Sequence, residues 1–374
     1  MSSFDIVVVG CGGGPSEHNL SSYLLKAADA TWEDGIVALE AGSGMGALTK
    51  LLGSRPDAFA NPGSTPADSD GPPALKTAAD VYARIRCYLV THAHLDHVNG
   101  LVLSAGSVKG LPKRVYGHQK TLEGLAGIFA GDVWPNLASW EDAEQPGTCL
   151  LLSPIPPDAG YTPVARDLAV RAMPLSHGET PAGGTYPSAA FFVRHAPSAR
   201  ELLFFGDVEP DAVSRARGGP RTLDVWRAAA PKVPHALPAL FIECSWPAGR
   251  PADTLYGHLG PEHLAAELAA LAQEVAGVRE REQARAREGE RPNGARKKRR
   301  RNTDAAPDAR GALAGLTVYV IHVKDDLQGA FDEPIHEVVA RQVRELVEAK
   351  GLGAEIIAAE QGMHILTDIR FAAI

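Results

Sequence analysis

The stretch THAHLDHVNGLVLSAG, Thr91 to Gly106, places three histidines and one aspartate within six residues. These residues are His92, His94, Asp96 and His97, and all four side chains can bind a metal ion. The apolar run IRCYLV precedes them and predicts a buried strand that ends at the cluster. Beyond the strand end, both imidazoles of His92 and His94 can turn toward one ion, whereas Asp96 and His97 point elsewhere and suit a second. The pattern therefore predicts a metal centre.

Several later apolar runs are also typical of strands, and most end in a side chain that could bind a metal. The runs Leu168–Gly178, Glu201–Asp207 and Leu316–Asp326 place His or Asp at or just past their C-terminal ends, and another ends at Glu243. Two amphipathic segments, PEHLAAELAALAQEVAG and PIHEVVARQVRELVEAKG, predict helices, the first with Pro261 near its start. The chain is therefore expected to mix strands and helices, with polar groups gathered at strand ends.

The composition is typical of a globular cytoplasmic protein. Of 374 residues, 45% are hydrophobic, which is enough for a sizeable core. No apolar run reaches the eighteen residues expected of a membrane span, and the start of the chain predicts a strand and not a signal peptide. The four cysteines are scattered and form no CxxC pair, which favours reduced thiols in the cytoplasm. We expect no membrane partner.

The charge is unevenly distributed along the chain. Residues 279–310 contain twelve Lys and Arg against six Asp and Glu, so the rest of the chain has a charge of −14 within the total of −8. An acidic body does not favour binding to nucleic acid. The low-complexity segment 279–310 predicts a disordered, charged insertion, and Ser54–Thr77 predicts a surface loop. The basic run Ala295–Arg301, ARKKRRR, leaves nuclear import or a nucleic-acid patch as a weaker alternative.

The metal motif resembles that of a known family. HxHxDH is the hallmark of the metallo-β-lactamase superfamily, and HAHLDHVNGLVLSA resembles the signature of class II cyclic-nucleotide phosphodiesterases. The match continues through Val98, Gly100 and Leu101–Leu103 to Ser104 and Ala105, and the N-terminal GCGGGPSEHNLSSYLL is also similar to that family. The resemblance implies one α/β domain over residues 1–374, an αββα four-layer sandwich with two mixed sheets and metals at one edge.

The resemblance also implies three further ligands. His177 in PLSHG would complete the first site, Asp207 in LLFFGDVEP would bridge both sites, and His322 in TVYVIHVKDD would belong to the second. One ion would then be held by His92, His94, His177 and Asp207, and the other by Asp96, His97, His322 and Asp207. Two divalent ions are expected; zinc suits this donor set best, with manganese or iron as alternatives.

Two more residues match the catalytic pattern of related phosphodiesterases. His258 in LYGHLGPEHL would assist the phosphate chemistry, and Glu243 in FIECSW would orient it; Asp96 is placed with them as both ligand and catalytic residue. The alternative is that His258 is the second-metal ligand and His322 is secondary. One departure is Glu40 in LEAGSG, where the superfamily often has Asp.

The function implied by the resemblance is hydrolysis of a 3′,5′-cyclic nucleotide to the 5′-nucleotide. The substrate would be cAMP, with cGMP as a further candidate, and the nucleophile would be a hydroxide that bridges two metal ions. The partner would thus be a small molecule, and a homodimer is left open. The alternatives are a tRNA 3′-processing endonuclease or a lactonase of the same fold, and a non-enzymatic nuclear adaptor that binds nucleic acid.

Overall fold

The computed structural model gives the path of the chain and most of its side chains. It describes residues 2–61, 75–107, 111–141, 147–157, 159–180, 183–214, 221–289 and 307–367. Part of the loop predicted over Ser54–Thr77 and all of the basic run 295–301 lie outside the described residues.

The first sheet of the described chain has eight strands in the order β15-β1-β2-β3-β4-β5-β7-β6. At one end of this sheet, β15, β1, β2 and β3 pair in antiparallel fashion. The next strands, β3, β4, β5 and β7, run parallel to one another. The bounds are β1 Phe4–Gly10, β2 Ser22–Ala27, β3 Ile36–Leu39, β4 Ile85–Leu89, β5 Lys113–Gly117, β6 Ala138–Ser139, β7 Leu150–Pro154 and β15 His364–Leu366.

The second sheet has seven described strands in the order β14-β13-β12-β11-β10-β9-β8. Strands β11 to β14 run parallel, and β8 to β10 form an antiparallel meander. The bounds are β8 Thr162–Ala165, β9 Leu168–Glu179, β10 Thr185–His195, β11 Arg200–Phe205, β12 Ala239–Glu243, β13 Thr317–Ile321 and β14 Glu355–Ala358.

The strands are apolar on both faces because each sheet is covered on both sides. In β1, Phe4 and Ile6 pack between the two sheets, whereas Val7 and Val9 face the helices of the first half. This alternation follows from the two-residue period of a strand. Strands buried on both faces are nearly continuous hydrophobic runs, and this is why the sequence showed them so clearly.

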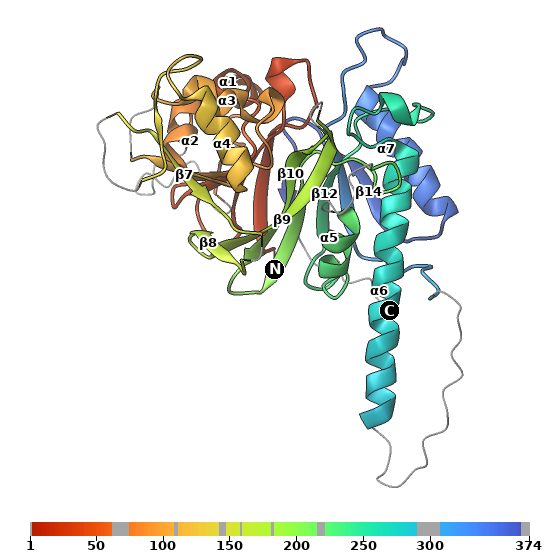
Figure 1. The fold of residues 1–374 in the computed structure, drawn as a ribbon. Coiled ribbons are helices and arrows are strands. Elements are labelled where there is room, and N and C mark those ends of the chain that lie inside the picture. Colours follow the sequence, from red (N-terminus) through yellow and green to blue (C-terminus); the bar gives the residue numbers. More distant parts are fainter. Residues whose placement is uncertain are drawn as a thin grey trace.

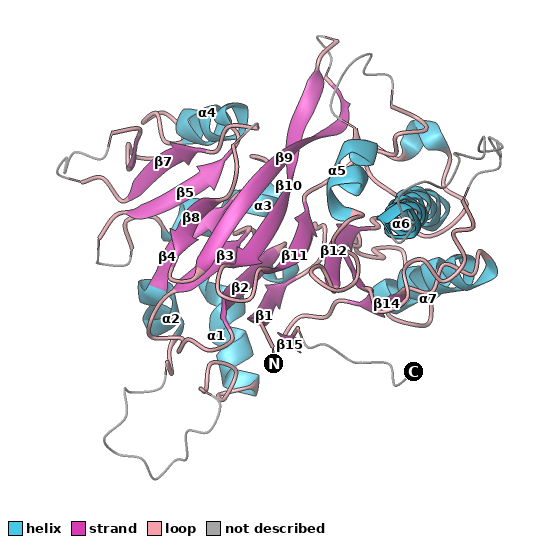
Figure 2. Cartoon of the chain, turned by 90° about the horizontal axis from the view of Figure 1, so that it is seen from below, coloured by secondary structure: helices cyan, strands magenta, loops and turns pink. Residues whose placement is uncertain are grey.

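Helices cover the outer face of each sheet. Helices α1 to α4 pack on the first sheet, and α5 to α7 pack on the second (Figures 1 and 2). The predicted αββα sandwich with two mixed sheets is therefore confirmed. The bounds are α1 Met45–Ser54, α2 Ala78–Arg84, α3 Leu95–Ser104, α4 Gln119–Ile128, α5 Thr222–Ala229, α6 Pro261–Gly289 and α7 Ile335–Ala349, with short 3-10 helices η1 Glu17–Asn19 and η2 Ala252–Thr254.

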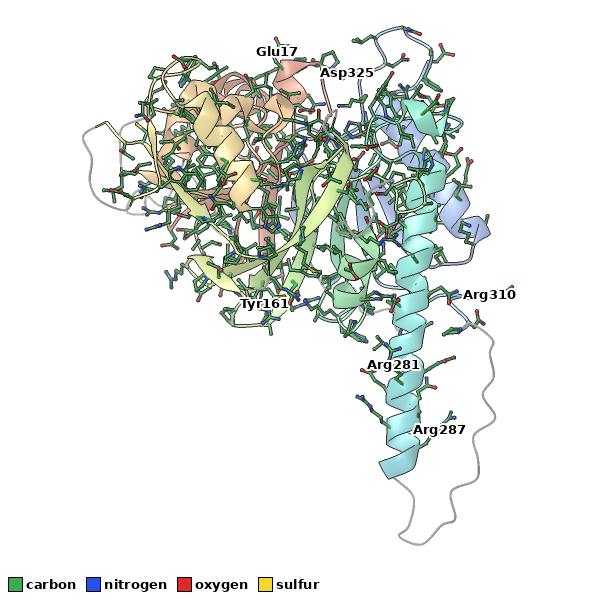
Figure 3. All side chains as sticks on the ribbon, in the orientation of Figure 1. Glu17, Tyr161, Arg281, Arg287, Arg310 and Asp325 are labelled. Carbon is green, nitrogen blue, oxygen red and sulfur yellow. The ribbon has the colours of Figure 1, made fainter. Side chains whose placement is uncertain are left out.

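Helix α6 corrects one prediction. It begins at Pro261 as predicted but continues to Gly289, so the disorder predicted from residue 279 is wrong for 279–289. Its buried positions end at Ala276, and beyond them the helix extends away from the body of the molecule, where Arg281 projects into solvent (Figure 3). Residues 290–306 of the predicted insertion lie outside the described residues. Among the described helices, none combines the length and apolar character needed to cross a membrane.

The topology brings the C-terminal ends of several strands to one edge. Strands β11, β12 and β13 are parallel neighbours, with Leu203 beside Leu240 and Leu240 beside Val318. Strand β9 runs in the same direction, because two antiparallel pairings separate it from β11. The residues that follow these four strands therefore lie at the same edge of the second sheet.

Candidate metal centre

The HxHxDH segment connects strand β4 to helix α3. His92 and His94 lie in the connection, and Asp96 and His97 are in the first turn of the helix, where a carboxylate interacts favourably with the helix dipole. Gly100 lets the helix approach the 41–43 backbone: its N–H donates to Gly42 O at 2.9 Å, and a Cβ there would lie 2.6 Å from Ser43 O. The close contact fixes the helix that carries Asp96 and His97.

Asp207 lies at the centre of the cluster and presents its two carboxylate oxygens to opposite sides. Its Oδ2 is 3.5 Å from both His92 Nε2 and His177 Nε2. Its Oδ1 is 3.3 Å from His97 Nε2 and 3.4 Å from His322 Nε2. This is the arrangement that a carboxylate bridging two ions requires.

The side chains that the sequence analysis named as ligands fall into two groups around Asp207, each compact enough for one ion, and a third group of His177, Asp207, Glu243 and His258 overlaps the first. In each group the candidate ligand atoms lie within 4.8 Å of one another. The first group is His92, His94, His177 and Asp207, and the second is Asp96, His97, Asp207 and His322. The structure thus brings together all seven residues that the sequence analysis named as ligands.

Hydrogen bonds behind the histidines orient their rings. His177 Nδ1 donates to Gly257 O at 2.8 Å, so its Nε2 is free to act as a ligand. His322 Nδ1 is 3.0 Å from Ser245 Oγ, and the His92 Nδ1 is 3.0 Å from Thr91 Oγ1. Such partners fix the tautomer and raise the basicity of the opposite nitrogen.

Glu40, the departure from the superfamily pattern, supports the cluster from behind. It is fully buried and adopts a left-handed backbone conformation with φ 59°. Its carboxylate accepts a hydrogen bond from the Thr91 hydroxyl and lies 3.4 Å from His97 Nδ1. The longer side chain therefore reaches Thr91, next to His92, and His97 within the cluster, and its carboxylate forms a further compact group with His92 and His97.

His258 and Glu243 form a buried pair beside the first group. His258 Nδ1 is 3.0 Å from Glu243 Oε1 and 3.8 Å from Asp207 Oδ2. The second Glu243 oxygen, Oε2, accepts from Ser245 Oγ at 2.8 Å and from Leu259 N at 3.1 Å. The carboxylate is thus held rigidly and fixes the imidazole that it contacts.

His322, and not His258, lies next to the other members of the second group. His322 Nε2 is 3.0 Å from His97 Nε2 and 3.3 Å from Asp96 Oδ2. His258 instead contacts the Asp207 oxygen that faces the first group. The geometry favours His322 as the second-site ligand and leaves His258 available for other chemistry.

Burial and the neighbouring charges together set the pKa values in the cluster. Burial lowers the pKa of His92 well below the usual value and that of His177 to about 4, which favours the neutral imidazole that binds metals. Burial opposes ionisation of Asp207, yet His322 and His97 outweigh it and hold the Asp207 pKa well below its ordinary value. Burial raises the pKa of Glu243 to about 7.

Divalent cations fit this arrangement of donors. Within the described residues, His92 Nε2 and Asp207 Oδ2 are buried with no hydrogen-bond partner. Leaving such atoms without a partner is costly. A cation held by the first ligand group would coordinate both His92 Nε2 and Asp207 Oδ2. The donors are imidazole nitrogens and carboxylate oxygens, a set that suits zinc and also manganese or iron.

The comparison with known families agrees with this site. A family model described as cAMP phosphodiesterases class-II matches residues 9–362 of the chain. The chain belongs to this family. The resemblance noted in the HxHxDH segment is thereby confirmed.

Two curated relatives align with most of the length of this phosphodiesterase family member. A 3′,5′-cyclic-nucleotide phosphodiesterase of Aliivibrio fischeri is 30% identical over 364 residues, which is 96% of this chain and 92% of the relative. A protein of the same name from Schizosaccharomyces pombe is 30% identical over 277 residues, 72% of this chain and 75% of that one.

Solved structures show the same fold. The unliganded yeast PDE1 structure has a TM-score of 0.76 at 23% identity and covers 98% of this chain and 100% of its own. The metallo-beta-lactamase fold protein YhfI of Bacillus subtilis has a TM-score of 0.53 at 14% identity, over 98% of this chain and 99% of its own. The second comparison supports the predicted superfamily fold.

Sequence reasoning missed one cation at the site of this phosphodiesterase family member. Lys324 Nζ is 3.6 Å from Asp96 Oδ2 and donates to Gly13 O at 2.6 Å. In the sequence it lies two residues after His322, but His322 adopts a left-handed conformation with φ 59°, so strand alternation does not relate the two side chains. A single lysine after a strand is too common for its position to have singled it out.

Proposed function

We propose that the protein hydrolyses 3′,5′-cyclic nucleotides, cAMP and also cGMP, to 5′-nucleotides at a centre with two divalent ions. The observation that carries the proposal is the placement of Asp207, whose two oxygens face two separate groups of ligand-type side chains. Membership of the class II cAMP phosphodiesterases supports the substrate class. The same match favours this function over a tRNA endonuclease, a lactonase or a nucleic-acid adaptor.

The chemistry divides between the ions and the chain. Two bound divalent ions, zinc by the donor set, would supply a hydroxide held between them and positive charge beside the phosphoryl oxygens. The nucleophilic oxygen forms a bond to phosphorus as the bond from phosphorus to O3′ breaks. Displacement of O3′ leaves the phosphate on the 5′ carbon.

Side chains of the protein stabilise and protonate the leaving oxygen. O3′ departs with negative charge and must gain a proton. Glu243 holds the Nδ1 of His258, so a His258 that is protonated on both nitrogens can turn its Nε2–H to the leaving oxygen, donate that proton and become neutral. Burial lowers the pKa of His258 to about 4, which favours release of the proton. Lys324 adds a positive charge beside Asp96, on the side of the second group. The partner in this proposal is a small molecule; a homodimer and a cytoplasmic location stay predictions.

The test is product analysis with and without a chelator. The protein is incubated with cAMP, cGMP, a precursor tRNA and an acyl-homoserine lactone. We expect 5′-AMP and 5′-GMP, lost on chelation and restored by zinc or manganese. Turnover of the tRNA or the lactone alone would refute the substrate class, and a 3′-nucleotide product would refute the assigned leaving group.

A further inference from the structure

A cavity of about 640 Å³ opens beside the first ligand group. One wall is the loop that contains η2, including Asp253, Tyr256 and Gly257, and another includes Glu209 and Val213. Cavities that bind small organic ligands have volumes of about 300–1,000 Å³. The space is therefore of the size that a nucleotide needs.

Several residues that line the cavity are chain neighbours of the candidate catalytic residues. Gly178, which lines it, directly follows His177, and Glu209 lies two residues after Asp207. Gly257 directly precedes His258, and its carbonyl accepts the hydrogen bond from His177 Nδ1. A ligand in the cavity would thus border the side of the centre where His258 lies.

Glu209 is a buried, fixed acceptor in the wall of this cavity. The residue is 9% exposed, and its backbone N–H donates to Ser176 O at 2.9 Å. Its Oε1 accepts from the Ser176 hydroxyl and from Ser214 Oγ at 2.8 Å. Both side-chain hydrogen bonds that Glu209 makes with described residues end on Oε1. A carboxylate offers about four acceptor sites, so Glu209 can also accept a donor from a ligand.

Tyr256 provides an aromatic surface on the outer wall. Tyr256 is 68% exposed, although the loop that carries it is held in place by hydrogen bonds. Trp246 Nε1 donates to Leu255 O at 3.0 Å, and Arg250 Nε donates to Thr254 O at 2.6 Å. The Arg250 guanidinium also stacks 3.5 Å above the Trp246 ring. An exposed aromatic ring on a braced loop is suited to stacking with a flat ligand.

We propose that this cavity binds the nucleoside half of the cyclic nucleotide, with Glu209 accepting from the ribose 2′-hydroxyl and Tyr256 stacking on the base. The assignment rests on the proposed function. Three carboxylates, Glu179, Glu209 and Asp253, line the cavity, so it disfavours phosphate and favours groups that donate hydrogen bonds. The ribose is fused to the cyclic phosphate and must lie nearest the centre, which matches a buried Glu209 two residues after Asp207.

A second hollow, on the other side of the centre, is the competing location. It has a volume of about 520 Å³ and is lined by Asp96, Lys324 and Glu17 among others. Glu17 and Asp325 lie at this edge of the molecule (Figure 3), where the N–H of Ser16, next to Glu17, donates to Asp325 Oδ2 at 2.9 Å. Lys324 gives this hollow a cation, which suits a phosphoryl oxygen better than a neutral nucleoside. Glu17 therefore offers a matched control for Glu209.

The first test compares cAMP with 2′-deoxy-cAMP. We expect the wild-type protein to prefer cAMP in kcat/KM by roughly 10- to 100-fold, the range of a hydrogen bond to a charged group. In Glu209→Ala the preference should fall below about threefold, with kcat/KM for 2′-deoxy-cAMP changed little, and Glu17→Ala should behave as wild type. No preference in wild type, or an undiminished preference in Glu209→Ala, would overturn the role of Glu209.

The second test concerns the base and does not depend on Glu209→Ala folding. Tyr256→Ala should raise KM for cAMP by roughly 5- to 100-fold with kcat nearly unchanged, whereas Tyr256→Phe should retain the wild-type KM. An unchanged KM in Tyr256→Ala together with a raised KM in Glu17→Ala would place the nucleoside in the other hollow. Absence of turnover with every cyclic nucleotide would refute the proposed function itself, an outcome distinct from both.

Discussion

At the scale of single residues, the sequence motif located the cluster but not the contacts that hold it. HxHxDH is local, so four ligand-type residues could be named with their order in the chain. His177, Asp207 and His322 are distant in sequence, and only a family resemblance linked them to the motif. Lys324 could not be predicted because its role depends on a distance to Asp96 that no spacing in the sequence encodes.

Asp207→Ala is expected to lose both ions, or one ion and nearly all activity. The reason is that its two oxygens face different ligand groups, so its removal takes a donor from both. The measurement is metal content per chain by elemental analysis, alongside kcat for cAMP. Asp332→Ala, an exposed carboxylate, is the control. Full metal content with normal turnover in Asp207→Ala would remove Asp207 from the site.

His258→Ala and His322→Ala should separate chemistry from metal binding. We expect His258→Ala to keep its ions and lose on the order of a hundred- to ten-thousandfold in kcat, the range typical of a general acid. His322→Ala should instead lose metal, because His322 Nε2 lies 3.3 Å from Asp96 Oδ2 within the second group. Both variants are assayed for metal content and kcat. The reverse pattern would make His258 the ligand.

At the scale of elements, the strands were predictable and the length of α6 was not. Strands such as β11 and β12 are buried on both faces, so their sequences are continuous apolar runs that end at a polar residue. Apolar periodicity in α6 ends near Ala276, and the sequence past it is highly charged. A helix that is already formed can continue with residues of good helix propensity, such as Arg, Glu, Gln and Ala, without further burial. Composition therefore predicted disorder where the helix continues.

Strands β1, β2 and β15 share a buried ion pair that should make stability depend on pH. Asp5 Oδ2 is 2.9 Å from Lys26 Nζ, and Asp5 also contacts His364. Burial opposes the charge on Asp5, but the bonds to His364 and Lys26 outweigh it and lower the Asp5 pKa. A lowered folded-state pKa stabilises the fold above the unfolded value of about 3.9, and that stability is lost as pH falls through the folded pKa.

Asp5→Asn is therefore expected to be less stable at pH 7 and less sensitive to acid. Removing one partner leaves Lys26 buried without its counter-charge, which costs on the order of 3–5 kcal/mol. Urea unfolding of metal-stripped wild type and variant, at pH 7 and below pH 4, gives the difference in free energy of unfolding. That difference should shrink in acid, with Asp332→Asn as the control. A difference that is constant with pH would show that the pair contributes no linkage.

At the scale of the whole molecule, the metal centre joins the two halves of the sandwich. His92, His94, Asp96 and His97 follow β4 of the first sheet, whereas His177, Asp207 and His322 belong to or follow β9, β11 and β13 of the second. Ions shared between these groups would connect the sheets at one edge. A ligand that binds only the folded state stabilises it by about 2.7 kcal/mol at a hundredfold excess over its Kd.

Removal of the ions should therefore destabilise the entire fold and not the site alone. We expect a chelator to lower the Tm of the wild-type protein by at least several degrees in one cooperative transition, and added zinc to restore it. In Asp207→Ala the Tm should respond much less, because that variant lacks the residue shared by both groups. Differential scanning calorimetry with and without chelator measures both effects. Each ligand group contains side chains from both sheets, so the ions are expected to hold the sheets together. An unchanged wild-type Tm after verified metal loss would mean that the apolar core alone holds the two sheets together.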